Sequence, residues 1–214
     1  MRGEQMKGLF ITLEGPDGSG KSTVSRMLAS YLRERGLRVT LTREPGGTDI
    51  SEKIRHIILD NKNTEIAYTT EALLYAASRA QHISEKIVPA IDDGRIIICD
   101  RFVLSSLVYQ GIGRGLGIDS VKMINDFAIQ GIEPDAILFF DINPKIALKR
   151  KTRKSKGDRL EKEDISFHEK VYKGYKHLTE IYSEKIKVID ASKSKEEVFN
   201  QVRNIVDILL NEDK

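Results

Sequence analysis

Five short runs of branched apolar residues alternate along the chain with longer segments in which apolar residues recur every three or four positions. A short continuous apolar run is typical of a strand buried on both faces, whereas the longer period is typical of an amphipathic helix. The alternation therefore predicts an α/β fold, a parallel sheet flanked by helices. We expect the strands at residues 9–13, 39–42, 96–99, 136–140 and 187–189.

Start and stop residues mark two of the expected helices. The first begins at Lys21 and ends before Gly36, because glycine favours a helix C-terminus. Its apolar residues share one face: Val24, Met27, Leu28, Tyr31 and Leu32. The last helix opens with Ser194 and Glu197 in capping-box spacing. Its buried face is predicted to hold Val198, Val202, Ile205, Val206 and Leu209.

Length and composition narrow the class of protein. The chain has 214 residues, 40% apolar and 31% charged, which fits one globular domain over residues 1–214. The formal net charge is only +3, from 35 basic and 32 acidic residues, so charge gives no argument for a nucleic-acid partner. The single cysteine, Cys99, excludes an intramolecular disulfide and a multi-cysteine zinc site and favours the reducing cytoplasm. No apolar run approaches a membrane span or a signal-peptide core, so we expect neither membrane insertion nor export.

Residues 15–22 read GPDGSGKS and satisfy the phosphate-loop pattern G-x-x-x-x-G-K-[ST]. The expected strand before the loop and helix after it are the context that the motif requires; a plain glycine turn is the alternative. In this motif backbone N–H groups converge on an anion, Lys21 bridges the β and γ phosphates, and the Ser22 hydroxyl binds Mg²⁺. The residues expected to bind ATP here are Gly15, Pro16, Asp17, Gly18, Ser19, Gly20, Lys21, Ser22 and Thr23.

An acidic residue, Asp17, lies inside this anion-binding loop. Phosphate repels a carboxylate, so the side chain should turn away from ATP toward a cation or a hydroxyl group. We expect it to face the acceptor of the phosphoryl group, with a solvated turn aspartate as the alternative.

Basic residues follow two of the expected strands. Phosphoryl transfer depends on positioning and charge neutralisation, and open α/β sheets bind ligands at the carboxyl ends of their strands. Arg43 follows the second strand in TREPGGT, and Asp100 and Arg101 follow the third. Asp100 is expected to orient magnesium-bound water while Arg101 contacts phosphate; a structural ion pair between them is the alternative.

Tyr75 and Arg79 are spaced i, i+4 in the helical stretch 71–87 and therefore share a face. A flat ring beside a bidentate donor suits a nucleobase. The alternative is that Tyr75 belongs to the core, as aromatic residues on helices usually do.

Residues 149–164 read KRKTRKSKGDRLEKED, an almost wholly polar run without period between two helical patterns. We expect this run to form a mobile loop, with a lid at about residues 150–164.

Together these segments resemble the thymidylate kinase family, whose members phosphorylate dTMP to dTDP with MgATP. The resemblance spans nearly the whole chain and rests on FITLEGPDGSGKST (10–23), TREPGGT (42–48), EALLYAASRAQH (71–82), DRFVLSSLVYQGIGRG (100–115) and DRLEKED (158–164). It implies the three-layer P-loop nucleoside-monophosphate kinase fold, with a five-stranded parallel sheet under helices, and usually a homodimer. It also implies Mg²⁺ as cofactor and ATP as co-substrate.

The resemblance further implies an acceptor site for dTMP. Asp17 looks like the carboxylate that meets the sugar 3′-hydroxyl, while Arg55 and Arg101 resemble the arginines that bind the acceptor phosphate. Tyr75 occupies the position of an aromatic residue, usually phenylalanine, that stacks on thymine, and Arg79 resembles the arginine that donates to the base. The remaining matches are Glu44, near the acceptor and magnesium, and the residues that read base and sugar: Ser105, Ser106, Gln110 and Tyr109, which crowds a 2′-hydroxyl.

One departure from the family shifts the expected source of catalytic charge. Some members place an arginine directly after the acidic loop residue, but Gly18 stands there in this chain. The chain therefore resembles the subgroup whose lid carries the catalytic arginine. We expect Arg153 in that role and Arg150 beside adenine, with a merely solvated charged loop as the alternative. The expected catalytic residues are Lys21, Arg101, Arg153 and Asp17, and the expected magnesium residues are Ser22, Asp100 and Glu44, partly through water.

The acceptor phosphate is itself nucleophilic at neutral pH, so the expected mechanism has no general base and relies on alignment and charge. Rival functions are a kinase for another monophosphate or for deoxynucleosides, a P-loop GTPase switch, and a nucleic-acid-dependent ATPase. Residues 61–64, NKNT, lack the aspartate of the guanine motif Asn-Lys-x-Asp, and no basic stripe lies beside aromatic residues. The resemblance therefore implies phosphorylation of dTMP, a step in the synthesis of dTTP.

Overall fold

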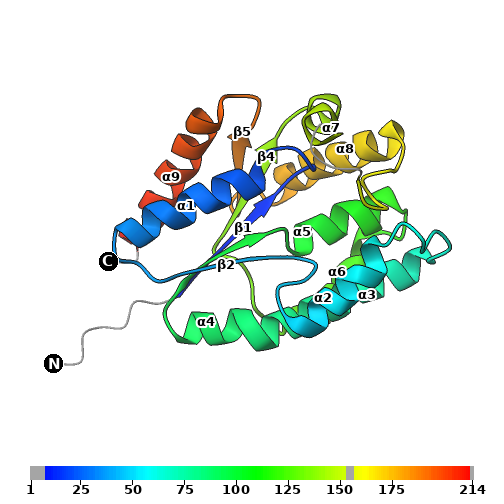
Figure 1. Ribbon diagram of the computed structural model, residues 1–214, viewed down its shortest axis with the longest axis horizontal. Coiled ribbons are helices and arrows are strands. Elements are labelled where there is room, and N and C mark those ends of the chain that lie inside the picture. The colour runs from blue at the N-terminus through cyan, green and yellow to red at the C-terminus, as the bar shows by residue number, and fades with distance from the viewer. Residues whose placement is uncertain (1–7, 153–156, 213–214) are drawn as a thin grey trace.

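The computed structural model describes residues 8–152 and 157–212 of the chain. Five strands in these residues form one sheet: β1 (Leu9–Glu14), β2 (Val39–Arg43), β3 (Ile96–Asp100), β4 (Ala136–Asp141) and β5 (Ile186–Asp190). Every paired strand is parallel to its neighbour, in the order β2-β3-β1-β4-β5 (Figure 1). The predicted α/β class and five-stranded parallel sheet are confirmed, and each predicted apolar run lies inside one strand.

The carboxyl ends of β1, β2 and β3 meet at one edge of the sheet. In the parallel register, Leu13 of β1 and Arg43 of β2 both lie opposite Asp100 of β3. All residues of β1 are buried, as expected for a central strand covered on both faces. The polar residues that follow these strands are thereby brought together from distant parts of the sequence.

One face of the sheet is covered by α1 (Lys21–Glu34) and α9 (Lys195–Glu212) (Figure 1). Their buried apolar residues pack with Ile11 and Leu13 of β1 and with Ala147 of α7 (Pro144–Thr152). The opposite face is built from side chains such as Phe10 and Phe139, which belong to two other clusters. Because strand residues alternate between faces, the sheet forms the middle of three layers.

The predicted ends of these two outer helices are largely confirmed. α1 begins at Lys21, and Gly36 behind it has a φ of 79°, a conformation that glycine adopts without strain. Ser194 and Glu197 each accept from the other's backbone N–H group, so the capping box of α9 is present. The predicted buried face of α9 ends one residue too early. Leu210 is buried, whereas Leu209 is only partly buried.

The second outer layer comes mainly from the middle of the chain (Figure 1). It contains α2 (Asp49–Leu59), α3 (Tyr68–His82), α4 (Val88–Asp92), α5 (Val103–Ser106), α6 (Ile118–Ile129) and α8 (Ile165–Ile181). Two π-helical segments, η1 (Ile83–Ile87) and η2 (Leu107–Gly113), continue α3 and α5. Segments of this kind often occur at functional sites, and η2 carries Tyr109 and Gln110.

The predicted loop at residues 149–164 begins later than expected, whereas residues 157–164 form turns and irregular backbone between α7 and α8. α7 extends through Thr152, because the sequence KIALKRKT consists largely of good helix formers. Leu160 is only 6% exposed and packs against the cluster that contains Phe139. Asp164 caps α8 by accepting from the Phe167 N–H group. Residues 153–156 lie outside the described part of the chain.

Within residues 8–152 and 157–212, every helix is too short or too polar to span a bilayer.

Candidate active site

A cavity of about 620 Å³ opens at the carboxyl edge of β1, β2 and β3. It collects predicted site residues from segments that are distant in the sequence. Those that line it are Asp17, Gly18, Gly20, Lys21, Ser22, Thr23, Glu44, Arg55, Tyr75, Arg79, Asp100, Arg101, Ser105, Ser106, Tyr109, Gln110 and Arg150. Gly15, Pro16 and Ser19 belong to the same loop without lining the cavity, and Arg153 lies outside the described residues.

The phosphate loop joins β1 to α1 through glycines in conformations that other residues rarely adopt. Gly15, Gly18 and Gly20 have φ values of 133°, 83° and 98°. A Cβ atom on Gly15 would also lie 2.8 Å from the carbonyl oxygen of Phe140, which is closer than a real contact. Glycine is therefore required at the first position of the motif for both backbone conformation and space. The helix that follows, α1, begins at Lys21, which lines the cavity. The N-terminus of α1 therefore lies at the edge of the cavity.

Lys21 is 5% exposed and its ammonium group lies against its own loop. It donates to the carbonyl oxygens of Gly15 at 2.9 Å and Pro16 at 3.0 Å. Burial, and next the neighbouring charge of Arg101, lower the pKa of Lys21. Such a site favours an approaching anion, because negative charge would offset both effects.

Ser22 and Asp100 bring together an oxygen pair of the kind that magnesium prefers. The Ser22 hydroxyl, at the start of α1, donates to Asp100 Oδ2, at the end of β3, over 2.6 Å. Hydroxyl and carboxylate oxygens suit Mg²⁺, which keeps several waters and uses few protein ligands. The described residues contain no cluster of three or more histidine, cysteine, aspartate or glutamate side chains able to hold a metal. Residues Ser22 and Asp100 therefore fit a metal held jointly by protein, water and phosphate.

Asp17 links the phosphate loop to the residues predicted to bind the acceptor. Its Oδ1 atom lies 2.9 Å from Arg101 Nη2, and both side chains are partly buried. The cation that Asp17 was expected to meet is thus Arg101, whereas Asp100 bonds to Ser22.

Arg101 is held by hydroxyl groups on its other side. Its Nη1 atom donates to Ser105 Oγ at 3.0 Å and to the Tyr175 hydroxyl at 3.4 Å, and Nη2 donates to the Tyr109 hydroxyl at 3.3 Å. The guanidinium also lies over the ring of Tyr109, 5.1 Å from its centroid. Burial raises the pKa of Tyr109 to about 12, so its hydroxyl remains protonated at neutral pH. Arg101 is therefore charged, oriented and partly desolvated at the cavity wall.

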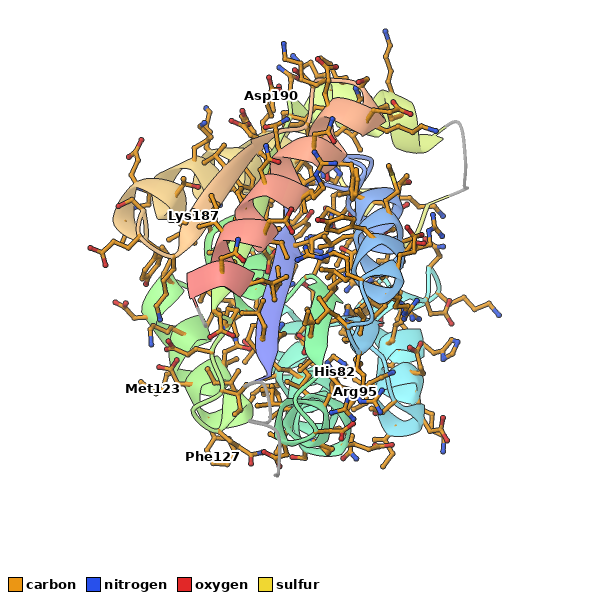
Figure 2. All side chains as sticks on the ribbon, turned by 90° about the vertical axis from the view of Figure 1, so that its left-hand side faces the viewer. His82, Arg95, Met123, Phe127, Lys187 and Asp190 are labelled. Atoms are coloured by element: carbon orange, nitrogen blue, oxygen red, sulfur yellow. The ribbon has the colours of Figure 1, made fainter. Side chains whose placement is uncertain are left out.

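Arg79 and Glu44 form a buried ion pair in the cavity lining. Arg79 Nε donates to Glu44 Oε2 at 2.7 Å, and each side chain is 2% exposed. The other oxygen of Glu44 lies 2.9 Å from Nδ1 of His82, which is fully buried in the interior (Figure 2). Arg79 also donates from Nη1 to Ser106 and to Asn125 of α6. This network fixes Arg79 from several elements, and it engages both oxygens of Glu44.

Two further predicted residues complete the wall opposite the phosphate loop. Arg55 donates to the carbonyl oxygen of Pro45 at 2.7 Å, and burial, with the nearby Arg43 charge, lowers the pKa of Arg55. Tyr75 lies one helical turn before Arg79 on α3, and both line the cavity. Burial raises the pKa of Tyr75, so it presents a neutral ring.

A second buried carboxylate, Glu71, binds the segment at residues 157–164 to the acceptor side. Gln110 donates to Glu71 Oε1 at 2.9 Å, and the guanidinium groups of Arg114 and Arg159 both pair with Oε2. Sequence reasoning missed Glu71 and Arg114, because their partners are distant in the chain. Leu160 and Asp158 of the same segment line the cavity.

Arg150 lies at the end of α7, on the donor side of the cavity. Its guanidinium donates to the carbonyl oxygens of Ala191 at 2.9 Å and Ser192 at 3.3 Å, just after β5. The predicted neighbour of adenine therefore lines the cavity while it is bonded to the segment that follows β5.

Two buried residues beneath the site were not predicted, Glu14 and Tyr175. Glu14 is the last residue of β1 and is 0% exposed, and the Tyr175 hydroxyl lies 3.2 Å from its Oε2 atom. A carboxylate in an otherwise apolar strand was the available signal, since such a group must find donors when buried.

Comparison with known proteins yields one family. A family model described as thymidylate kinase matches residues 13–202. The thymidylate kinase of Finegoldia magna is 57% identical over 194 residues, which cover 90% of this chain and 95% of that relative. The thymidylate kinase of Geobacillus sp. (strain WCH70) is 56% identical over 91% of this chain and 93% of that relative. A crystal structure of thymidylate kinase from Ehrlichia chaffeensis matches with a TM-score of 0.77 and 31% identity, over 93% of this chain and 98% of that chain.

Proposed function

The chain belongs to the thymidylate kinase family and phosphorylates dTMP to dTDP in dTTP synthesis, and we propose how its residues divide this reaction. The observation that carries the proposal is the Asp17–Arg101 pair, 2.9 Å long, which joins the phosphate loop to the opposite wall of one cavity. ATP would lie on the side of the loop and dTMP on the side of Arg101. The acceptor phosphate would then meet the γ-phosphate between them.

On the donor side, residues 15–23 hold the phosphates of ATP through backbone N–H groups, and Lys21 bridges the β and γ phosphates. Lys21 leaves the carbonyl oxygens of Gly15 and Pro16 to do so. Mg²⁺ would be held by the Ser22 hydroxyl and by Asp100, partly through water, and would neutralise phosphate charge. Glu44 is the weaker magnesium candidate, because Arg79 and His82 already engage its two oxygens.

On the acceptor side, Arg55 and Arg101 bind the phosphate of dTMP. Tyr75 stacks on thymine while Arg79, fixed by Glu44, donates to the base. Asp17 accepts from the sugar 3′-hydroxyl. The remaining contacts to base and sugar come from Ser105, Ser106, Gln110 and Tyr109, the last of which crowds a 2′-hydroxyl and favours deoxyribose.

Catalysis rests on alignment and charge. The dTMP phosphate attacks the γ-phosphorus in line, the bond to the β-phosphate oxygen breaks, and ADP leaves. No general base is needed, because the attacking phosphate oxygen is already ionised. Since Gly18 supplies no cation, we assign the additional transition-state charge to Arg153 and contact with adenine to Arg150. The segment at about residues 150–164 would close over ATP and exclude water.

A panel of acceptors tests this assignment. Initial rates with MgATP are measured on dTMP, dUMP, dCMP and thymidine. We expect the highest kcat/KM on dTMP and no turnover of thymidine, because the two acceptor arginines require a phosphate. Fastest turnover on another acceptor would contradict the proposed site.

A homodimer is proposed because adjacent helices expose large apolar side chains. α3 packs against both α2 and α6. On α6, Phe127 is 87% and Met123 72% exposed, and both point outward (Figure 2). The other exposed large apolar residues of these helices are Ile50, Ile57, Tyr68 and Leu73. Large exposed apolar side chains gathered on adjacent helices are typical of protein–protein interfaces, and twofold dimers are the commonest closed assembly.

Sedimentation equilibrium tests the dimer. The wild-type chain should sediment as a dimer and Phe127→Glu as a monomer. Ile208→Glu on α9, which is 57% exposed in the other outer layer, serves as the matched control and should remain dimeric. A monomeric wild-type chain would contradict the proposal.

We also place the reaction in the cytoplasm, where ATP is available and where a single cysteine remains reduced. Cys99 is a buried free thiol. ATP and dTMP are the proposed partners, with neither nucleic acid nor membrane required.

A further inference from the structure

Arg101 has a backbone conformation that its side chain disfavours. Its φ is +74°, in the left-handed region that residues other than glycine seldom adopt. The two peptide N–H groups around this residue are both bound by the end of β1. The Arg101 N–H donates to the Leu13 carbonyl oxygen at 2.9 Å, and the Phe102 N–H donates to Glu14 Oε1 at 2.7 Å. A conformation of this kind persists where surrounding contacts over-determine it.

The second oxygen of Glu14 holds the hydroxyl groups that carry the Arg101 side chain. Ser105 donates to Glu14 Oε2, and so does the Tyr175 hydroxyl, at 3.2 Å. Each of these hydroxyls has one proton. The Ser105 proton points to Glu14, and the Tyr175 proton points to Glu14 or to the Ser105 oxygen, 3.0 Å away. In both cases lone pairs of Ser105 and Tyr175 are left to accept from Arg101 Nη1, at 3.0 and 3.4 Å.

We propose that Glu14 is a positioning residue for Arg101: one carboxylate fixes the strained backbone around the arginine and orients the hydroxyls that receive its guanidinium. Glu14 is 0% exposed and does not line the cavity, so it acts through Arg101 and does not touch the substrate. The inference rests on the proposed role of Arg101 in binding the dTMP phosphate.

A carboxylate suits this role because both of its oxygens face donors, the Phe102 N–H group on one side and two hydroxyls on the other, and an ionised carboxylate only accepts. An amide of the same shape has one accepting and one donating end. In one orientation of an introduced amide, its NH₂ group would face the Phe102 N–H group. In the other orientation it would face the two hydroxyls. In the second case the hydroxyl protons would turn toward the Arg101 guanidinium. Glu14→Gln therefore disturbs Arg101 while leaving volume almost unchanged.

Binding of dTMP and of thymidine separates positioning from a merely structural role. The two ligands differ by the phosphate that Arg101 would bind. Loss of fold stability alone would lower the melting temperature without changing the ratio of the two affinities. Loss of positioning would weaken dTMP selectively.

The experiment is isothermal titration of Glu14→Gln with dTMP and with thymidine. We expect the Kd for dTMP to rise about tenfold, the effect of one charged hydrogen bond, and that for thymidine to stay within about twofold. The matched control is Thr12→Val on the same strand, because the buried Thr12 hydroxyl has no hydrogen-bond partner among residues 8–152 and 157–212. It should leave both affinities unchanged. An unchanged ratio in Glu14→Gln would overturn the proposal.

A second variant keeps the proposal testable if Glu14→Gln does not fold. Tyr175→Phe removes one hydroxyl and retains the ring stacked on Phe139, at 5.0 Å between centroids. It should weaken dTMP binding about threefold and leave thymidine binding unchanged. An unchanged ratio in this variant would also count against the proposal.

Arg101→Gln distinguishes failure of the inference from failure of its premise. If this variant lowers the preference for dTMP over thymidine and Glu14→Gln does not, the role of Glu14 is wrong and the role of Arg101 stands. If Arg101→Gln itself leaves the preference unchanged, the proposed phosphate contact is wrong, and the inference falls with it.

Discussion

The two halves of the cavity are built in different ways. The proposed donor half comes mainly from one continuous segment, residues 15–23, with Asp100 and Arg150 added from elsewhere, and Lys21 bonds to residues five and six positions away. The acceptor half is assembled from separate elements, and Arg79 bonds to partners 27, 35 and 46 positions away. A phosphate can be bound by backbone N–H groups, which a short loop supplies, whereas a base needs side chains arriving from several directions. Substitutions in the donor half should therefore have local effects. Substitutions in the acceptor half should act through the hydrogen-bond network that joins its residues.

The largest effect is expected for Lys21→Ala. Lys21 is the one cation in residues 15–23 and is proposed to bridge the β and γ phosphates, so its loss should abolish measurable turnover, a fall of more than about a thousandfold in kcat. Binding of dTMP without ATP, measured by titration calorimetry, should stay within about threefold if the halves are separable. Lys53→Ala, an exposed lysine on α2, is the control for charge. If Lys21→Ala weakened the binding of ATP and of dTMP equally, the division of the cavity into two halves would be wrong.

Arg153→Ala should lower kcat by on the order of a thousandfold, the contribution of an arginine finger, with little change in KM for dTMP. The expectation follows from Gly18, which leaves the phosphate loop without an arginine, and from the family resemblance. Single-turnover rates at saturating ATP measure it. Arg150→Ala is the companion variant and should raise KM for ATP instead. A near-normal kcat in Arg153→Ala would remove that residue from the catalytic role.

Tyr75→Ala tests the acceptor half alone. Stacking of an aromatic ring on a base contributes about 1–3 kcal/mol, so the Kd for dTMP should rise by roughly tenfold to a hundredfold. ATP affinity should not change. Tyr75→Phe keeps the ring and should bind dTMP as the wild type does. Equal loss in both variants would show that the hydroxyl matters and that stacking does not.

Local features were predicted from the sequence because the physics behind them is local. The inner strands β1, β3 and β4 are largely buried and have continuous apolar runs, whereas the edge strands β2 and β5 are partly exposed and were located from shorter runs. The capping box of α9 lies within four residues. The phosphate loop was recognisable for the same reason. The end of α7 was missed because a charged run resembles a loop by composition, although its residues are good helix formers.

The buried polar network could not be predicted from patterns alone. The bonds of Glu14, Tyr175, His82 and Asn125 include bonds to partners 38 to 161 positions away, and no spacing rule connects them. Arg101 and Tyr75 were identified through strand ends, helix periodicity and family resemblance. What holds Arg101 in place became visible only when β1, η2 and α8 were packed together.

The smallest predicted effect concerns two buried glutamates that border the acceptor half and differ in their surroundings. Burial raises the pKa of Glu14, against opposition from the Ser105 hydrogen bond and the charge of Arg101. Burial also acts on Glu71, but hydrogen bonds from Gln110, Arg114 and Arg159 outweigh it and hold the pKa of Glu71 below its ordinary value of 4.5. Glu71 accepts three hydrogen bonds from two arginines and one from the Gln110 amide. These donors account for the opposite directions of the two pKa shifts.

Glu71 should therefore make the free energy of unfolding depend on pH in the acid range. The unfolded carboxyl group binds its proton at a higher pH than the folded one, so unfolding takes up a proton as pH falls below the unfolded pKa. The contribution of Glu71 is fully present above that pKa and is lost as pH falls through the lowered folded value. Urea unfolding between pH 7 and pH 3 should show a smaller acid loss in Glu71→Gln than in the wild type, a difference of about 1 kcal/mol. Glu180→Gln, at an exposed position on α8, should leave the slope unchanged. An identical slope in Glu71→Gln would mean that the arginines bind the amide as well as the carboxylate, and that the acceptor half does not depend on this charge.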